Sequence, residues 1–247
     1  MTEQSATVQL GTIGVRKHHV AALLEVDVTR ARCGLRVANR GGGSTVSFLA
    51  WLVKNVASSM ALYPATRKMG TSVDVSIMIE RQVDGRRVVL PLLIAGASGR
   101  AVEEIEAQIV LARREPVRGA LVLFGRHEPT LGWIYRFMPA ILRRLLLDRR
   151  LANPRRTPAA MGNVLITSVG MGGRIKGWFI PKSMHPLCIG IGAVTPKAVV
   201  MNGRIEPRQV LHLTVLADQS IVDGAPGSRW ISSLVRAMEN GAELSIN

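Results

Sequence analysis

One stretch near the C-terminus, residues 211–225, constrains the fold more than any other part of the chain. It reads LHLTVLADQSIVDGA, a run rich in apolar and β-branched residues that ends at an Asp-Gly pair. Such a run predicts a β-strand, and Asp-Gly is a frequent turn sequence. Residues 228–238 then carry apolar side chains at helical spacing. We therefore expect a strand, a tight turn and a helix, which together hold polar side chains at the end of the strand.

Strand and helix patterns alternate through the rest of the chain. Strands are predicted at 20–28, 73–80, 87–94, 163–169, 187–194, 198–200 and 206–216. Helices are predicted at 46–60 and at about 98–114. Asn202-Gly203 predicts a hairpin turn. This mixture favours one α/β domain at 15–247, preceded by a flexible tail at 1–14.

Two helix starts are predicted from hydroxyl side chains. Ser44 follows a glycine loop and is expected to cap the helix at 46–60. Thr29 follows the first strand and is expected to cap a short basic helical turn. Both are the residue type that accepts a hydrogen bond from a free backbone N–H of the first turn.

The charge balance predicts anionic partners. The 247 residues include 32 Lys and Arg against 17 Asp and Glu, a net charge of +15. A positive protein attracts anions in general, and the charge alone does not say which anion. Nucleic acid is not favoured, because no aromatic residues are interleaved with the basic ones and no nucleic-acid motif is present.

Cysteine usage and the N-terminus indicate a cytoplasmic protein. Cys33 and Cys188 form no CxxC pair and no His cluster accompanies them, so neither a disulfide framework nor a metal site is predicted. The first residues lack the basic and apolar regions of a signal peptide. No run reaches the roughly 18 apolar residues that a membrane-spanning helix needs.

Residues 118–160 form a less typical, basic segment. Within it, 133–151 can form a helix with one apolar side and one arginine-rich side. Such a helix can lie on an anionic membrane surface as a peripheral contact. It can also pack its apolar side on its own protein or on a neighbouring subunit, the interpretation that we favour because any surface helix has this pattern.

Four stretches, in this order, resemble a known family: EVDVT at 25–29, residues 47–64, NVLITSVG at 163–170 and DQSIVDGA at 218–225. The chain resembles the catalytic core of the dihydrolipoamide acyltransferases of 2-oxoacid dehydrogenase complexes and, more distantly, chloramphenicol acetyltransferase. The resemblance implies a chloramphenicol acetyltransferase-like, coenzyme A-dependent acyltransferase fold, in which a mixed sheet packs with helices. It also implies a homotrimer with active sites at subunit interfaces, a possible cage assembly, and acyl-coenzyme A or a lipoyl-bearing protein as partner.

The resemblance also implies roles for four residues. In the family a His takes the proton from the attacking thiol, and here that position holds Gln219. Thr167 takes the place of the hydroxyl that stabilises the oxyanion from the neighbouring subunit, although Thr is also an ordinary strand residue. Asp223 is the structural acid of the Asp223-Gly224 turn, a pair common in turns of any protein.

Two functions remain open at this point. A carboxamide does not take up a proton at physiological pH, so Gln219 predicts an inactive or weakly active scaffold subunit. Alternatively, the chain is an active coenzyme A-dependent acyltransferase that relies on Thr167 and a thiol ionised in another way. His212 is not a substitute base, since seven strand residues separate it from Gln219 by roughly 20 Å. The chain shows no lipoyl-domain pattern before residue 15.

Overall fold

The computed structural model describes residues 19–41, 45–63, 72–83, 86–115, 161–168, 176–219 and 224–243. The predicted tail at 1–14, the basic segment at 118–160 and its helix at 133–151 therefore lie outside the described residues. The described elements, in chain order, are β1 (His19–Asp27), α2 (Thr29–Arg40), α3 (Phe48–Ala61), β2 (Val75–Val83), β3 (Arg86–Ile94), η2 (Ala97–Gly99), α4 (Val102–Arg114), β4 (Val164–Ser168), β5 (Leu187–Met201), β6 (Arg204–Asp218) and α8 (Gly224–Glu239).

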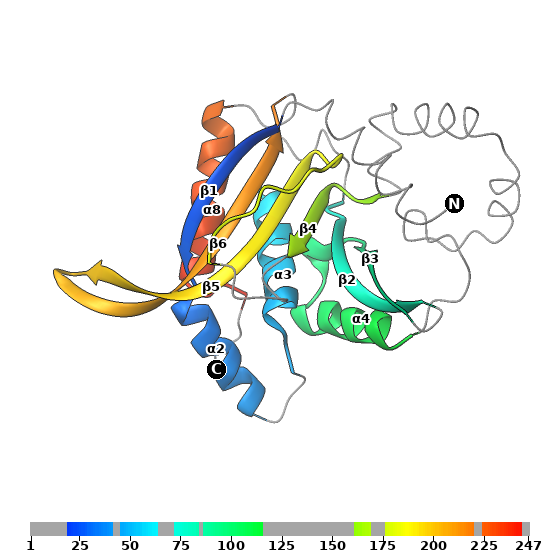
Figure 1. The fold of residues 1–247 in the computed structure, drawn as a ribbon, viewed down its shortest axis with the longest axis horizontal. Helices are drawn as coiled ribbons and strands as arrows, with labels where there is room; N and C mark the ends of the chain where they lie inside the picture. Colours follow the sequence, from blue (N-terminus) through cyan, green and yellow to red (C-terminus); the bar gives the residue numbers. More distant parts are fainter. Residues whose placement is uncertain are drawn as a thin grey trace, which may run out of the picture.

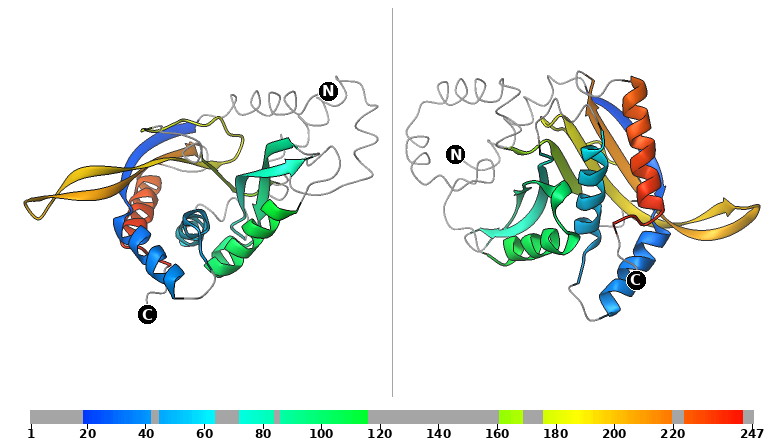
Figure 2. Two further views of the ribbon diagram at one scale, coloured as in Figure 1. Left: turned by 60° about the horizontal axis from the view of Figure 1, so that its bottom comes forward. Right: turned by 180° about the vertical axis from the view of Figure 1, so that it is seen from behind.

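The strands form a single mixed sheet in the order β1-β6-β5-β4-β2-β3. β4 runs parallel to both β2 and β5, and the other neighbouring pairs are antiparallel. Helices α3, α4 and α8 lie on one face of the sheet (Figures 1 and 2). The predicted mixed sheet packed with helices is confirmed.

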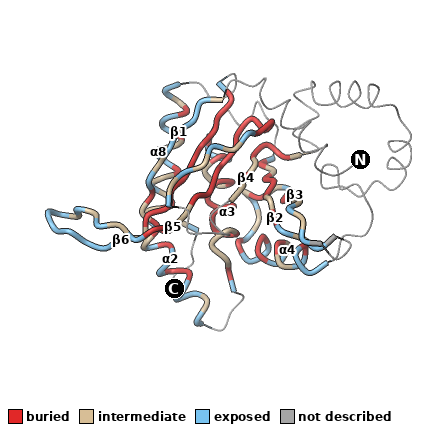
Figure 3. The backbone as a smooth tube through the Cα atoms, viewed as in Figure 1, coloured by how far each residue is buried: buried red, intermediate tan, exposed pale blue. Residues whose placement is uncertain are grey.

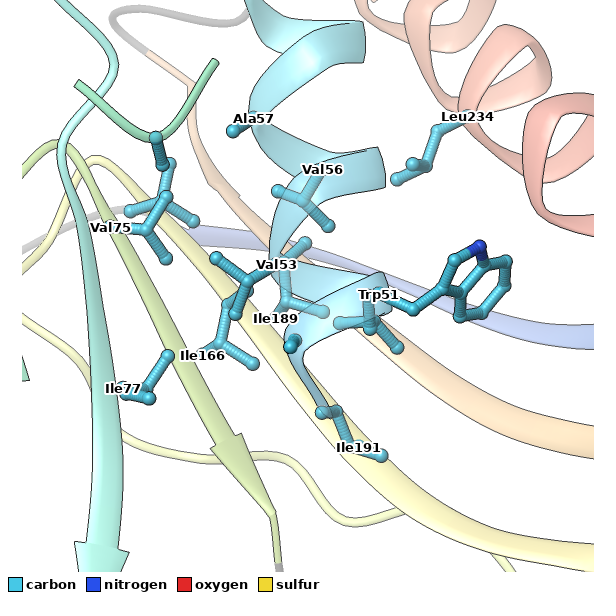
Figure 4. Packing of buried hydrophobic residues seen from close by; sticks show 14 of the residues in the cluster. Trp51, Val53, Val56, Ala57, Val75, Ile77, Ile166, Ile189, Ile191 and Leu234 are labelled. Carbon is cyan, nitrogen blue, oxygen red and sulfur yellow. The ribbon is translucent and has the colours of Figure 1, made fainter. Parts of the chain in front are cut away.

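Helix α3 lies at the centre of the core. Its Trp51, Val53 and Val56 are fully buried and belong to the cluster that contains Ile166 of β4 and Ile189 of β5 (Figure 4). Full burial of a Val or Ile side chain stabilises the folded state by about 1.5–3 kcal/mol. Leu234 of α8 joins the same cluster, so the helix that follows the C-terminal strand is held against α3.

The start of α3 differs from the sequence prediction. The helix begins at Phe48, and its N-cap is Ser47, whose Oγ accepts a hydrogen bond from the backbone N–H of Ala50 at 3.2 Å. Glu106 of α4, almost fully buried, accepts hydrogen bonds from the backbone N–H and the hydroxyl of Ser47. Ser47 is therefore fixed by a helix distant in sequence, a contact that local capping rules do not include. The predicted cap, Ser44, lies outside the described residues.

Thr29 is also not a cap. It is the first residue of α2, a helix of 12 residues where only a short turn was predicted. Its hydroxyl donates to Asp27 Oδ1 at 2.5 Å and accepts from the backbone N–H of Gln209 at 2.8 Å. The hydroxyl therefore joins β1 to β6, and the prediction that it caps the helix is wrong.

Strands β5 and β6 form a hairpin that projects beyond the sheet (Figure 1). The two predicted strands at 187–194 and 198–200 are one continuous strand, with a register shift between Ile191 and Val194. Among the described strands, residues 195–201 of β5 pair only with β6, and residues 204–208 of β6 pair only with β5. Asn202 and Gly203 make the predicted turn with positive φ values of 50° and 77°. Much of this projecting part is exposed, as Figure 3 shows.

The base of the hairpin is tied to β1 by two ion pairs. Arg208 Nε lies 2.6 Å from Asp27 Oδ2, with both side chains mostly buried. Lys197 Nζ lies 2.5 Å from Glu25 Oε1 in a more exposed position. Burial alone would raise the pKa of Asp27, but hydrogen bonds from Thr29 and Arg208 outweigh it and lower the pKa below its ordinary value. The EVDVT stretch at 25–29 thus orients the hairpin.

We expect Asp27→Asn to lower the free energy of unfolding by about 1–3 kcal/mol at pH 7, because it removes a charge-assisted hydrogen bond. A carboxylate whose pKa is lower in the folded state stabilises the fold above its unfolded pKa of about 3.9. This contribution is lost as the pH falls through the folded pKa, so the difference between variant and wild type should shrink toward pH 3. Urea unfolding at pH 7 and pH 3 checks both expectations. An equal difference at the two pH values would contradict them.

Candidate functional site

Gln219 is the first residue after β6, and it is exposed in a turn. Asp218 before it is mostly buried, and its backbone N–H donates to the carbonyl of Pro186 at 2.8 Å. The end of β6 is thereby fixed, while the amide of Gln219 stands toward solvent. Gly224 is exposed at the start of α8, whereas Asp223 lies outside the described residues. The structure thus places the proposed base position at the junction between strand and turn.

Thr167 lies on β4, partly exposed. It is opposite Gly190 of β5, which in turn is opposite Thr214 of β6. Ile166 and Ile189, the preceding neighbours of Thr167 and Gly190, face the helices in the core. Because side chains alternate along a strand, Thr167 and Thr214 point to the face without these helices.

One chain does not bring Thr167 and Gln219 together. Two strand spacings separate Thr167 from Thr214, and Gln219 lies five residues beyond Thr214. With about 4.8 Å between strands and about 3.3 Å per residue, the two Cα atoms are about 19 Å apart. A site that uses both side chains on one small reacting group therefore needs a second copy of the chain.

A histidine that the sequence left unplaced lies opposite Asp218, the residue before Gln219. His19 of β1 is directly opposite Asp218 of β6. Its Nε2 is 3.0 Å from the backbone carbonyl oxygen of His185. Since a carbonyl oxygen only accepts, Nε2 carries the proton, and Nδ1 is then the ring nitrogen with a lone pair. Sequence reasoning missed this position because His19 and Asp218 meet only through strand pairing.

His185 has a buried structural position. Its backbone N–H donates to Ser183 Oγ at 3.0 Å, and its Nε2 donates to the carbonyl of Met161 at 3.1 Å. Ser76 of β2 also donates to that carbonyl. His185 therefore connects the residues before β4 with the segment that leads into β5.

His212 lies two residues before Thr214, on the face of the sheet without the helices, and Trp178 packs against it. The two rings are edge to face with centroids 4.6 Å apart, and Trp178 Nε1 donates to the carbonyl of Leu24 at 2.8 Å. His212 Nδ1 donates to the carbonyl of Ala193 at 3.0 Å. These contacts account for a buried imidazole on β6, and the absence of a base role for His212 stays a prediction.

The segment 177–181 crosses the face of β5, and two glycines make room for it. A Cβ on Gly192 would lie 2.4 Å from the carbonyl oxygen of Gly177. A Cβ on Gly190 would lie 3.2 Å from the side chain of Pro181. Glycine within a strand often marks such a close approach of backbone. This crossing segment, which we name the 177–181 strap, covers the face on which Thr167 lies.

The two thiols lie in very different surroundings. Cys33 is exposed on α2, whereas Cys188 is buried on β5. Burial raises the pKa of the Cys188 thiol to about 12, despite a hydrogen bond with Ser183. Thiol reagents attack the thiolate, so Cys188 is protonated and unreactive at ordinary pH.

We expect one of the two thiols to react with an aromatic disulfide reagent in the native protein at pH 8, and both to react in urea. Cys33→Ser should abolish labelling of the native protein, while Cys188→Ser should leave it unchanged. Counting released thiolate by absorbance checks this. Rapid labelling of two thiols without denaturant would contradict the buried position of Cys188.

The described residues also bear on metal binding and on membrane insertion. They contain no group of three or more His, Cys, Asp or Glu side chains that could hold a metal ion. None of the described helices combines the length and the apolar character needed to cross a membrane.

The C-terminal part of the chain matches a known family in sequence. Residues 154–246 match the family described as 2-oxoacid dehydrogenases acyltransferase (catalytic domain). The acetyltransferase component of the pyruvate dehydrogenase complex of Bacillus subtilis is 22% identical over 236 residues, covering 90% of this chain and 45% of the relative. That of Rickettsia prowazekii is 34% identical over 80 residues, covering 32% of this chain and 19% of the relative. The chain thus spans less than half the length of these relatives.

Solved structures show the same fold. A probable dihydrolipoamide acetyltransferase from Listeria monocytogenes superimposes with a TM-score of 0.68 at 14% identity, covering 100% of this chain and 96% of the other. The cubic core of a pyruvate dehydrogenase multienzyme complex gives a TM-score of 0.63 at 14% identity, covering 96% and 88%. In sequence over residues 154–246 and in fold over nearly its whole length, the chain resembles the catalytic core domain of the dihydrolipoamide acyltransferases of 2-oxoacid dehydrogenase complexes.

Proposed function

We propose that this chain is an oligomeric scaffold subunit with an acyltransferase-core fold and little or no transferase activity. The observation that carries the proposal is Gln219, which stands at the end of β6 where the family signature has its base. A carboxamide donates and accepts hydrogen bonds but takes up no proton near neutral pH. Loss of general-base assistance lowers a rate typically by about 10²- to 10⁴-fold.

The oligomer in this proposal is a homotrimer that can assemble further into a cage. Two observations support association between copies. Thr167 and residue 219 are too far apart within one chain to act on the same group. The β5–β6 hairpin also leaves the sheet with Val200 and Ile205 exposed by 68% and 75%. An isolated two-stranded hairpin is only marginally stable in water, so a neighbouring copy that covers these side chains stabilises it.

The ligands in this proposal are those of the family. Coenzyme A is the acyl carrier, and its negative charge complements the net charge of +15. A lipoyl-bearing protein is the thiol partner. Thr167 is the hydroxyl that one copy places beside residue 219 of the next, and Asp223 holds the turn that carries residue 219.

His19 favours a second candidate, an active coenzyme A-dependent acyltransferase. His19 is opposite Asp218 and has its Nε2 proton bound to the His185 carbonyl. The lone pair on Nδ1 is therefore available to take a thiol proton close to the position that Gln219 occupies. In this candidate the imidazole comes from β1 rather than from the turn after β6.

Acetyl transfer from acetyl-coenzyme A to dihydrolipoamide separates the two candidates. The scaffold proposal predicts no turnover above the uncatalysed rate for wild type and for His19→Gln alike. The active candidate predicts measurable turnover that His19→Gln removes. Weak turnover that survives His19→Gln would contradict only the active candidate, whereas turnover at the full wild-type rate of an active acyltransferase in both proteins would contradict both.

A further inference from the structure

Helix α2 presents an exposed row of arginines without ion-pair partners. Arg32, Arg36 and Arg40 follow one another at intervals of four residues, and Arg30 lies at the side of the row. All four are exposed, and none forms an ion pair with any residue in the part of the chain that the structure describes. A rise of about 1.5 Å per residue puts neighbouring arginines of the row about 6 Å apart along the helix.

The helix that carries the row is fixed by its buried side and by hydrogen bonds at both ends. Ala31, Gly34 and Leu35 form the buried side of α2. Asp27 accepts hydrogen bonds from the backbone and side chain of Thr29 at its start. At its end, Asn39 bonds to both the N–H and the carbonyl of Val46 at 2.9 and 3.0 Å. The arginines therefore project from a fixed helix, and their backbone needs no reordering when a partner binds.

A second copy of this chain does not fit the row. Most described carboxylates already have partners: Glu25, Asp27, Glu80, Glu104, Glu206 and Glu243 lie in ion pairs, and Glu106 is buried against Ser47. Each copy also carries a net charge of +15. Two copies thus repel each other at this face, and the partner must be a different and acidic molecule.

The apolar side chains beside the row favour a protein over other anions. Cys33 and Val37, themselves four residues apart, are exposed next to the arginines, Val37 by 54%. Protein interfaces combine an apolar centre with arginine and a polar rim. Nucleic-acid phosphates make no favourable contact with apolar side chains. The exposed side of α2 also has no aromatic residue on which a base could stack. A membrane surface helix carries larger apolar side chains than these.

We propose that α2 is a docking surface for an acidic amphipathic helix of another protein. Carboxylates at intervals of four residues on that helix face Arg32, Arg36 and Arg40, and the planar guanidinium groups bind them in a bidentate manner. Small apolar side chains of the partner pack on Cys33 and Val37. This surface lies apart from Gln219 and Thr167, so the inference does not depend on whether the chain catalyses acyl transfer.

The test uses the full chain and a labelled synthetic helix of about 20 residues, long enough to be helical in water. The probe carries Glu at intervals of four residues beside an Ala and Leu row, and a second probe of the same composition spreads its Glu residues over all faces. Fluorescence anisotropy should show tighter binding of the first probe and weakening with salt. Arg32→Glu with Arg36→Glu should weaken binding at least about tenfold.

Arg113→Glu with Arg114→Glu is the matched control, since it makes the same charge change at the exposed end of α4. This variant should bind the first probe nearly as wild type does, and circular dichroism should show both variants folded. Equal weakening in the two variants, or equal binding of the two probes, would show only a response to net charge and overturn the proposal. The proposal would also be overturned if the wild type bound DNA or anionic vesicles but not the first probe, and the α2 variant lost that binding.

Discussion

Replacing Gln219 with His is expected to raise the rate of acetyl transfer from acetyl-coenzyme A to dihydrolipoamide by about 10²- to 10⁴-fold. Imidazole takes up a proton near neutral pH, whereas the carboxamide does not. Gln219 is exposed in a turn, so the new side chain meets no packing obstacle in the described residues. Initial rates of coenzyme A release, measured with purified wild type and variant, check the expectation.

Two controls make this result specific. Gln219→Leu keeps a similar size and adds no base, so it should not raise the rate. Thr167→Ala added to Gln219→His should remove most of the gain, because the loss of one oxyanion donor costs about 10²- to 10³-fold. Wild-type turnover equal to that of Gln219→His would contradict the proposal that this chain lacks a working base.

Replacing Gly192 with Ala is expected to destabilise the fold by about 3 kcal/mol. The new Cβ would lie 2.4 Å from the carbonyl oxygen of Gly177 and 2.9 Å from that of His212. Both obstacles are backbone atoms, so the 177–181 strap or β6 has to move. Urea unfolding followed by tryptophan fluorescence measures the loss, and Trp178 on the strap reports any displacement.

The other glycines provide a graded series for the same experiment. Gly190→Ala should cost less, because its nearest obstacles lie at 3.2 and 3.3 Å. Gly99→Ala meets nothing within 4 Å and should change the stability little. A destabilisation at Gly192 no larger than that at Gly99 would mean that the strap does not cross β5 as described.

Local sequence signals were sufficient for the elements that depend on neighbouring residues. The alternation in β2, the helical spacing in α3 and the Asn202-Gly203 turn are all decided within a few positions, and all three were predicted. The prediction divided β5 into 187–194 and 198–200. Pro196 lies in that gap, and proline lacks the N–H that a central strand donates. The structure places Pro196 in the projecting hairpin, where β5 is an edge and a missing donor is tolerated.

The contacts around the candidate site depend on residues far apart in the sequence. Pairing of β1 with β6 brings His19 opposite Asp218, and no local pattern indicates this register. The close approach of Gly177 to Gly192 depends on the path of the strap over the sheet. Glu106 fixes Ser47 from another helix, so the start of α3 could not be located from capping residues alone. The position of Gln219, by contrast, followed from the signature at 218–225.

The particle mass in solution tests the central claim most directly, because a site that needs Thr167 and residue 219 from different copies exists only in an oligomer. Light scattering coupled to size exclusion should give three times the 26.8 kDa of one chain, or a multiple of that trimer if cages form. The mass should remain constant on dilution to micromolar concentration. A stable monomer of 26.8 kDa would contradict the account.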